Sequence, residues 1–331
     1  MTDPRELHDA VHEAASRVVV GNEPAIHGLI VAALTRGHVL LEGVPGVGKT
    51  TLARVFASVS GLETARVQMT PDLLPVDITG TFVYNEDTGE FTLRRGPVFA
   101  NLVIADEINR ATPKTQSALL ESMQERQVTI EGVTHQLDEP FMVVATQNPV
   151  EMEGTFDLPV AQRDRFQQKL TLDLPPEQTQ LDLLDRFDAE PWLEPEQVET
   201  RIDPDDLYAA QEFVATVHVA SQIKRYIVRL AEATRAHSDT IHGASPRATI
   251  ALLNTTKAHA ALDGREYVIP DDVQAMLPRV FAHRLVLSAE AELNERRGPE
   301  IIAEVLEDVD PPGSEPPEEA AAIAYAPDDG E

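Results

Sequence analysis

The sequence predicts an α/β protein whose mainly parallel, five-stranded sheet is covered by helices and followed by a smaller all-α domain. Three observations predict this fold class. Strand-like and helical segments alternate up to Pro175-Pro176, and a glycine-rich loop joins one such strand to a helix. Beyond those prolines only helical periodicity is found. The length of 331 residues suits two domains.

The first domain is expected to span residues 1–175. Prolines near the starts of several segments preset helical geometry, and short β-rich apolar runs that stop at glycine or carboxylates indicate buried strands. Alternating β-formers that flank turn residues indicate hairpins. The expected segments are helices at 4–17, 24–36, 49–60 and 113–126, strands at 38–43, 65–70, 101–107, 140–148 and 168–175, and hairpins at 79–96 and 127–137.

The second domain is expected at residues 176–307 and contains no segment comparable to the earlier strands. A tail at 308–331, rich in Pro, Glu, Asp and Ala, is expected to be disordered because it offers little apolar surface to bury. The expected helices lie near 178–187, 205–217, 221–237, 246–262 and 270–283, with a last turn or two at 299–307.

Composition excludes several classes of protein. The chain has no cysteine, which excludes disulfides and cysteine-ligated metals. No apolar run reaches the ~18–20 residues of a membrane helix, and the N-terminus lacks a signal-peptide stretch. These features predict a cytoplasmic protein without membrane insertion. His8 and His12 share a helix face, but two imidazoles alone make a metal site improbable.

The net charge is −29, with 56 acidic and 27 basic residues. Only eight of the acids lie in the tail from Asp308 onward, and only five lysines occur in the whole chain. An acidic, lysine-poor surface suits molar salt, where the Debye length falls to about 3 Å and self-repulsion is screened. We therefore expect a halophilic source, with an archaeon favoured; an ordinary acidic protein is the alternative.

A phosphate-binding loop follows the strand at 38–43 and opens the helix at 49–60. Its sequence matches G-x-x-x-x-G-K-[ST], in which glycines let backbone N–H groups approach phosphate oxygens at a helix N-terminus. The lysine would neutralise phosphate charge, and the hydroxyl of Thr50 would ligate Mg²⁺. The expected nucleotide-binding residues are Gly43, Val44, Pro45, Gly46, Val47, Gly48, Lys49, Thr50 and Thr51.

A second motif is the apolar strand Leu102–Ala105, which ends in Asp106 and Glu107. Ligands of open α/β sheets bind at the carboxyl ends of the strands, where these two acids would lie. Asp106 is expected to hold Mg²⁺ together with Thr50, and Glu107 to polarise the attacking water.

With these motifs placed, residues from about 15 to 290 resemble AAA+ ATPases, and specifically the MoxR family. Several long stretches in the same order carry the resemblance, which makes it far more specific than a phosphate loop alone. They include RVQMTPDLLPVDITGT (66–81), GPVFANLVIADEINRATPKTQSALLESMQERQVT (96–129), ATQNP (145–149), LPVAQRDRF (158–166), GASPRA (243–248) and IPDDVQAMLPRVFAHRLVL (269–287).

The resemblance implies roles for single residues. Asn148 matches sensor 1, and Arg247 matches sensor 2. Arg165 matches the arginine finger that acts on a neighbouring subunit, although Arg163, two positions earlier, is an alternative. Val20 and Gly21 match the adenine-pocket turn.

Residues 70–96 resemble the helix-2 insertion of this clade, and the hairpin at 127–137 resembles the insertion before sensor 1. Both insertions are expected to contact clients. Three residues depart from the family pattern: Asn22 often is glutamine, Val160 is commonly acidic and Arg163 is commonly apolar. Arg110 and Arg126 are further candidates for a subunit interface.

The expected function is a Mg²⁺-dependent ATPase that assembles into a homo-oligomeric ring, most simply a hexamer, with ATP bound between subunits. The resemblance implies chaperone-like maturation or assembly of protein complexes, with a von Willebrand factor A domain protein as a partner. A helicase-like motor on nucleic acid is the alternative; it is disfavoured because basic clusters beyond Arg94-Arg95 and Arg296-Arg297 are lacking. A scaffold that only binds ATP would need neither Glu107 nor Asn148.

Overall fold

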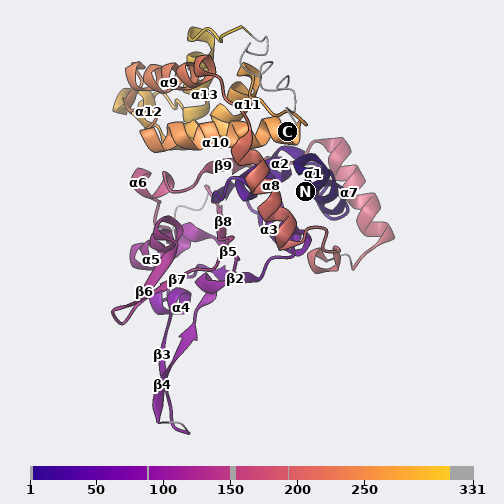
Figure 1. Ribbon diagram of the computed structural model, residues 1–331, viewed down its shortest axis with the longest axis vertical. Coiled ribbons are helices and arrows are strands. Elements are labelled where there is room, and N and C mark those ends of the chain that lie inside the picture. The colour runs from indigo at the N-terminus through magenta and orange to yellow at the C-terminus, as the bar shows by residue number, and fades with distance from the viewer. Residues whose placement is uncertain (1–2, 88, 150–153, 193, 314–331) are drawn as a thin grey trace, which may run out of the picture. The chain divides into compact units, whose positions relative to one another are not determined.

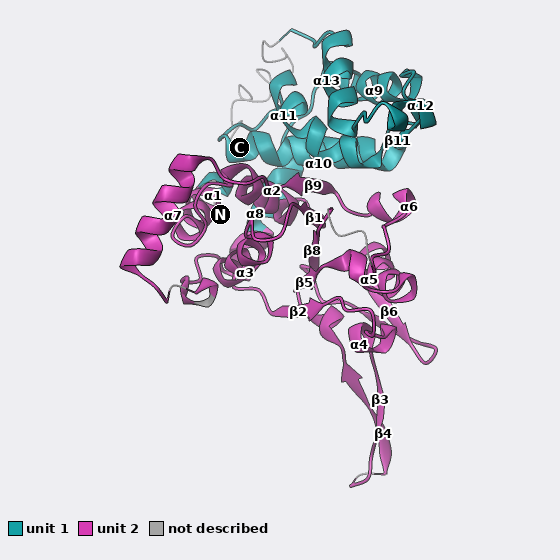
Figure 2. Cartoon of the chain, turned by 180° about the vertical axis from the view of Figure 1, so that it is seen from behind, with its two compact units in different colours: residues 1–5, 209–331 teal, residues 6–208 magenta. Residues whose placement is uncertain are grey.

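A computed structural model describes residues 3–87, 89–149, 154–192 and 194–313. The chain forms two compact units, residues 6–208 and residues 1–5 with 209–331, which are coloured separately in Figure 2. Most of the tail that was expected to be disordered, residues 314–331, lies outside the described residues.

The unit at 6–208 is built on the predicted five-stranded sheet, and all four strand pairings are parallel. The strand order is β2-β5-β8-β1-β9, which places the strand before the phosphate loop between β8 and β9. Because the strands are parallel, their carboxyl ends share one edge of the sheet. The strands are β1 (Val39–Glu42), β2 (Thr64–Gln68), β5 (Leu102–Asp106), β8 (Met142–Gln147) and β9 (Gln168–Thr171).

Helices cover this sheet, as Figure 1 shows. Proline occupies the first turn of three of these helices, where its missing N–H costs nothing. The strand β5 is buried along its whole length, as a parallel strand covered on both faces must be. The helices named first in this unit are α1 (Pro4–Ala15), which begins just before its boundary, α2 (Glu23–Leu34), α3 (Lys49–Ser60) and α5 (Pro113–Glu125).

Two antiparallel hairpins leave the sheet, and both were predicted. After the short helix α4 (Pro75–Thr79), β3 (Gly80–Asn85) pairs with β4 (Glu90–Arg95) and extends away from the sheet in Figure 1. The second hairpin joins β6 (Gln127–Ile130) to β7 (Val133–Gln136). Side chains on the first hairpin remain exposed, among them Val83, Tyr84 and Phe91.

The first unit extends beyond the predicted domain boundary at 175/176 and ends at Tyr208. The helix α7 (Glu177–Ala189) belongs to it because Arg186 on this helix bonds the carbonyl of Ser16. Further along, the backbone N–H groups of Arg201 and Ile202 donate to the carbonyl of Val59. The sequence placed the boundary at Pro175-Pro176 because strands stop there, but these long-range bonds keep the following segment on the α/β unit.

The second unit is mainly helical, but the prediction of an all-α domain was wrong in one detail. A small antiparallel sheet pairs β10 (Thr240–His242) with β11 (Val286–Leu287), strands too short to show an alternating pattern. The helix α8 (Pro204–Thr216) crosses the boundary between the units. The remaining helices are α9 (Ser221–Ala236), α10 (Pro246–Leu262), α11 (Pro270–Phe281), α12 (Ala289–Leu293) and α13 (Gly298–Asp308).

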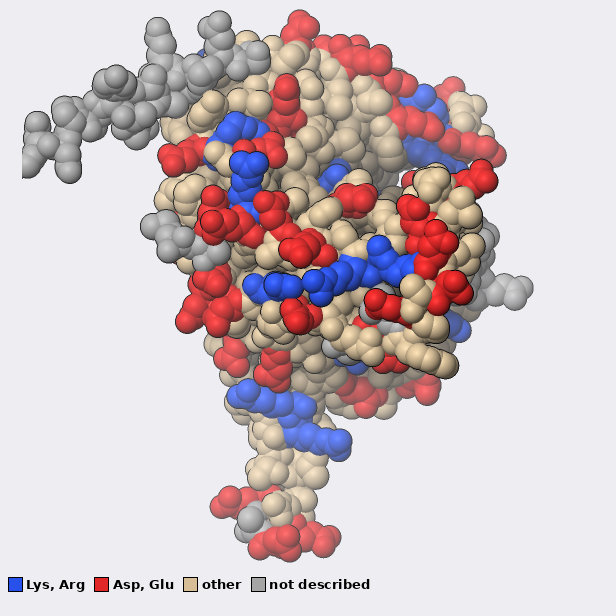
Figure 3. Space-filling view, turned by 90° about the vertical axis from the view of Figure 1, so that its right-hand side faces the viewer, with Lys and Arg blue, Asp and Glu red and all other residues tan. Residues whose placement is uncertain are grey.

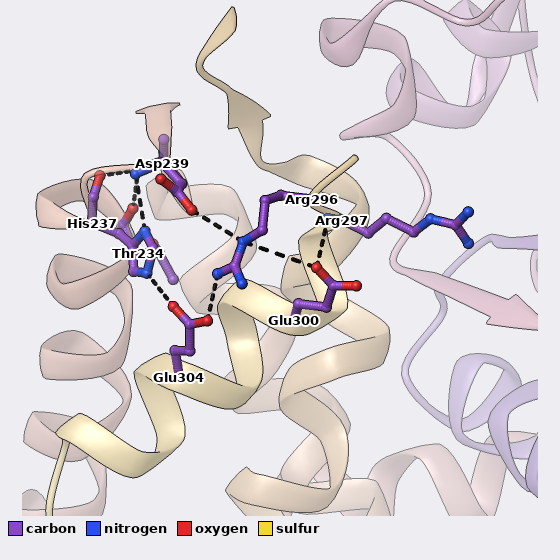
Figure 4. Close-up of polar contacts among 8 residues, drawn as sticks. Thr234, His237, Asp239, Arg296, Arg297, Glu300 and Glu304 are labelled. Atoms are coloured by element: carbon purple, nitrogen blue, oxygen red, sulfur yellow. Dashed lines mark hydrogen bonds and ion pairs between the residues drawn. The ribbon is translucent and has the colours of Figure 1, made fainter. Parts of the chain in front are cut away.

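Ion pairs fasten the end of α9 to α13, as Figure 4 shows. Arg296 bonds Glu304 and reaches Asp239 at 3.2 Å, while the ring of His237 lies 3.1 Å from the second oxygen of Glu304. These hydrogen bonds, above all the one from Arg296, lower the pKa of the Glu304 carboxyl.

No described helix combines the length and the apolar character that crossing a membrane requires.

Candidate nucleotide-binding and hydrolysis site

The phosphate loop lies where the sequence placed it, between the end of β1 and the first turn of α3. Gly46 and Gly48 adopt φ of +84° and +88°, a conformation that side chains rarely tolerate. A Cβ built on either glycine would meet no atom within 4 Å, so the loop faces open space that a phosphate group can enter.

Lys49 curls back over its own loop. Its Nζ donates to the carbonyl oxygens of Gly43 at 2.6 Å and Val44 at 2.9 Å. Gly43 itself is packed tightly, because a Cβ there would lie 2.4 Å from the carbonyl oxygen of Leu172 after β9. The two hydrogen bonds to the loop carbonyls hold the ammonium group of Lys49 beside the loop. A phosphate oxygen could replace one of these carbonyls as its acceptor.

The two predicted motifs meet through a hydrogen bond. The Thr50 hydroxyl donates to Oδ1 of Asp106 at 2.8 Å, and Asp106 is 1% exposed. A hydroxyl and a carboxylate are the oxygen ligands that Mg²⁺ prefers, so the pair predicted to bind the metal is assembled. Thr146 on β8 also donates to Oδ1 of this carboxylate, at 3.3 Å.

Glu107 adopts φ 56° and ψ 53°, a left-handed conformation that costs a residue other than glycine about 1 kcal/mol. Its N–H donates to the hydroxyl of Thr146 at 2.9 Å. Its Oε2 accepts from Gln68 Nε2 at 2.8 Å and from Arg110 at 3.0 Å. Arg110, a candidate for a subunit interface in the sequence, therefore contacts the predicted water-polarising carboxylate of its own chain.

Sequence reasoning assigned no role to Arg66 and Gln68, which lie on the edge strand β2. Arg66 Nε donates to Oδ2 of Asp106 at 2.7 Å, and Gln68 holds Glu107. Alternate residues of a strand share a face, so β2 delivers one side chain to each carboxylate at the end of β5. The signal was the stretch RVQMTPDLL (66–74), but only the pairing of β2 with β5 shows which carboxylates Arg66 and Gln68 contact.

Asn148 directly follows β8 and is 4% exposed, and its carbonyl accepts a hydrogen bond from Asn109 at 3.3 Å. Its side chain lines a cavity of about 490 Å³ together with Arg163. Arg165 is half-buried and its side chain makes no hydrogen bond or ion pair with a described residue. Arg163 lines the Asn148 cavity of its own chain, and its Nε is buried without a hydrogen-bond partner among the described residues, so the lack of a described partner does not separate the two candidate fingers.

Three further predicted site residues belong to other elements. Val20 and Gly21 form the turn between α1 and α2, where Gly21 has φ +70° and packs against Thr179. Arg247 lies in the first turn of α10, in the second unit. The roles of Val20, Gly21 and Arg247 remain predictions.

Arg126, the other candidate for a subunit interface, donates to Glu139 at 2.8 Å and to the carbonyl of Arg36 at 3.1 Å, both within its own chain.

With this geometry in place, comparisons identify the family. Residues 38–168 match the model of the ATPase family associated with various cellular activities, and residues 232–305 match an AAA lid domain. Chaperone MoxR1 of Mycobacterium tuberculosis is 43% identical over 89% of this chain and 79% of its own. The chain belongs to the MoxR family of AAA+ ATPases.

Two further similarities cover almost all of this MoxR-family chain. Protein YeaC of Bacillus subtilis is 44% identical over 94% of this chain and 98% of its own. A crystal structure from Cytophaga hutchinsonii, assigned there as a candidate ATPase, is 39% identical with a TM-score of 0.85 and covers 94% of this chain and 96% of that one. The predicted AAA+ fold with a helical lid domain is thereby confirmed.

Proposed function

We propose that this MoxR-family protein hydrolyses ATP with Mg²⁺ at the carboxyl edge of its sheet. The observation that carries the proposal is the 2.8 Å hydrogen bond between Thr50 and Asp106, which joins the phosphate loop to the acidic strand. Glu107 follows directly, and Gln68 and Arg110 orient its carboxylate. The same edge thus carries phosphate-binding, metal-binding and base functions.

In this proposal each residue has a defined task. The N–H groups of the loop and Lys49 bind the phosphates, and Thr50 and Asp106 hold Mg²⁺. The bound metal would neutralise charge on the phosphate oxygens. Glu107 accepts a proton from the attacking water, and the amide of Asn148 orients that water.

The decisive test is Glu107→Gln, which keeps the shape of the side chain but removes its basicity. ATP binding should persist while hydrolysis falls at least about a hundredfold, within the range that general bases contribute. The matched control is Glu121→Gln on the exposed side of α5, which should hydrolyse ATP at the normal rate. Normal hydrolysis by Glu107→Gln would remove Glu107 from the mechanism.

We further propose a homo-oligomeric ring, a hexamer in the simplest case, in which Arg165 reaches the nucleotide of the neighbouring subunit. The match of Asp164-Arg165-Phe166 to the family's finger position supports this role over Arg163. Arg165→Ala and Lys49→Ala should each be inactive alone. Mixed rings should regain activity, because some interfaces combine an intact finger with an intact phosphate loop. Mixed rings that form and stay inactive would refute a finger acting in trans.

The proposed biological role is chaperone-like work on protein complexes, with a von Willebrand factor A domain protein as partner. The name of the Mycobacterium relative, chaperone MoxR1, supports this role. The exposed Tyr84 and Phe91 of the β3–β4 hairpin, with ring centroids 5.3 Å apart, offer an apolar surface to a client. Isolation of proteins bound to the Glu107→Gln variant would identify the client. A nucleic-acid motor remains disfavoured.

We also propose that the protein is adapted to high salt. The net charge of −29 supports this, and acidic side chains are spread widely over the face drawn in Figure 3. The melting temperature should rise between ~0.1 and ~3 M KCl because salt screens the repulsion between carboxylates. A melting temperature that stays constant or falls would contradict the adaptation.

A further inference from the structure

Positive charge gathers on the outward side of α9, a basic cluster that the sequence analysis missed. Lys224, Arg225 and Arg229 are exposed there, next to Val228, whose side chain is 45% exposed. We call these four residues the α9 basic surface. Neither Lys224 nor Arg225 has an ion pair with any described residue, although the chain holds 56 acidic residues. Among the described residues, Arg229 donates a hydrogen bond to the backbone carbonyl of Asp310 at 3.1 Å, and its Cζ lies 5.8 Å from the ring centroid of Tyr226.

A second lysine adds to this charge from the neighbouring helix α10. Lys257 donates to the carbonyl of Ala215 at 2.6 Å, and its pKa is lowered by partial burial and by the nearby charge of Lys224. Two of the five lysines of the chain are therefore close enough to repel each other. An anionic group at this surface would relieve that repulsion.

The surface is also hollowed. A shallow cavity of about 570 Å³ is lined by α9 and by Pro312, near the end of the described chain. Its lining is mainly apolar and comes from Val228, Pro312 and the aliphatic parts of Lys224, Arg225 and Arg229. Such a surface suits a segment that combines apolar side chains with carboxylates on either side.

The chain contains such a segment directly after this point. Residues 314–331 include six acids and no base, and the acids flank the apolar stretch 320–326 with Ile323 and Tyr325. Ile323 is about ten residues beyond Gly313, a tether that reaches at most about 35 Å when fully extended. Since Pro312 already lines the hollow, no longer reach is needed.

We propose that residues 314–331 dock onto the α9 basic surface of their own chain, with the stretch 320–326 in the hollow and Glu318 and Glu319 beside the cations. Charge complementarity, the apolar lining and the position of the chain end carry this inference together. It does not depend on ATP hydrolysis by this protein.

The absence of native cysteine allows a direct test in the full-length protein. Val228→Cys is combined with Ile323→Cys, and disulfide formation under mild oxidation is followed by mass spectrometry of the digested protein. We expect an intrachain disulfide that forms at least about tenfold faster than in the control pair Ile250→Cys with Ile323→Cys. Ile250, on α10 of the same unit, is 60% exposed and lies outside the lining of the hollow.

The charge contribution is tested in the same cysteine pair. Adding Lys224→Gln and Arg225→Gln should slow the disulfide at least about threefold, whereas exchanging Lys224→Arg and Arg225→Lys should not. Circular dichroism confirms that each variant is folded. Equal rates at positions 228 and 250, or a rate indifferent to charge removal, would overturn the proposal. The Val228→Cys and Ile323→Cys single variants are also mixed. A disulfide that forms between these two chains, but not within the chain that carries both cysteines, would also overturn the proposal, because a neighbouring copy would then supply the segment.

Discussion

His38 offers a quantitative test of how the core is built at the start of β1, the strand that leads to the phosphate loop. It directly precedes β1 and is 6% exposed. The N–H of Val143 donates to Nδ1 at 3.0 Å, so Nδ1 must be the unprotonated nitrogen, and Nε2 then donates to the carbonyl of Met123 at 3.0 Å. Burial, aided by the charge of Arg126, lowers the pKa of His38 from 6.5 to about 4.

Because the pKa of His38 is lower in the folded chain than in the unfolded chain, the unfolded chain binds a proton between these pKa values while folded His38 stays neutral. The stability held by neutral His38 is therefore complete above about pH 7 and is lost as the pH falls from the unfolded pKa of 6.5 toward the folded pKa of about 4. At 1.36 kcal/mol per pKa unit the full loss is about 3 kcal/mol, of which about 2 kcal/mol has occurred at about pH 5.

The perturbation is His38→Gln, which retains a donor and an acceptor but does not titrate. Free energies of unfolding are measured by urea denaturation at about pH 7.5 and about pH 5, at one salt concentration. The native protein should lose about 2 kcal/mol more than the variant between these pH values, because all other groups cancel in the difference. The exposed His242→Gln variant should behave like the native protein. Equal losses in the native protein and His38→Gln would refute the assignment of His38 as a buried neutral histidine.

Three further outcomes are expected. Gly48→Ala should abolish binding of a fluorescent ATP analogue, because the new Cβ would enter the open space that we assign to the phosphates. The control is Gly132→Ala at a hairpin turn, where φ is +83° and the surroundings are equally open; it carries the same backbone strain and should bind the analogue normally. Arg265→Gln should lower the unfolding free energy of the helical unit by about 3 kcal/mol in denaturant titrations, because it leaves the buried carboxylate of Asp272, which Arg265 holds through both oxygens, without its cation. Arg201→Gln breaks an exposed pair with Glu199 in the α/β unit and should lower the unfolding free energy of that unit by less than about 1 kcal/mol. Tyr84→Ser with Phe91→Ser should leave basal ATP hydrolysis unchanged but reduce the protein recovered with the Glu107→Gln variant, and undiminished recovery would remove the hairpin from client binding.

The elements of the fold followed from local patterns. The helix at 246–262 and the start of α3 at Lys49 agree with the structure, because proline and glycine mark their ends and apolar spacing marks their length. The strands β10 and β11 were missed because three and two residues are too few to display a period. The end of the first unit was misplaced because hydrogen bonds from Arg201 and Ile202 to Val59 have no signature in local sequence.

The candidate site divides in the same way. Gly48, Lys49, Thr50, Asp106 and Glu107 could be named from the sequence, since phosphate and metal chemistry demands these residue types directly after a strand. Their assembly was decided by the tertiary structure, which brings Thr50 within 2.8 Å of Asp106 across 56 positions of chain.

What the sequence determined by itself is which residues make up the loop and the acidic pair, because each lies within a single continuous motif. What only the tertiary structure decided is which side chains control those acids. Arg66 and Gln68 reach Asp106 and Glu107 because β2 pairs in parallel with β5, a register set by packing between strands some 40 residues apart. Contacts of that kind depend on the pairing of whole elements, and no local pattern encodes them.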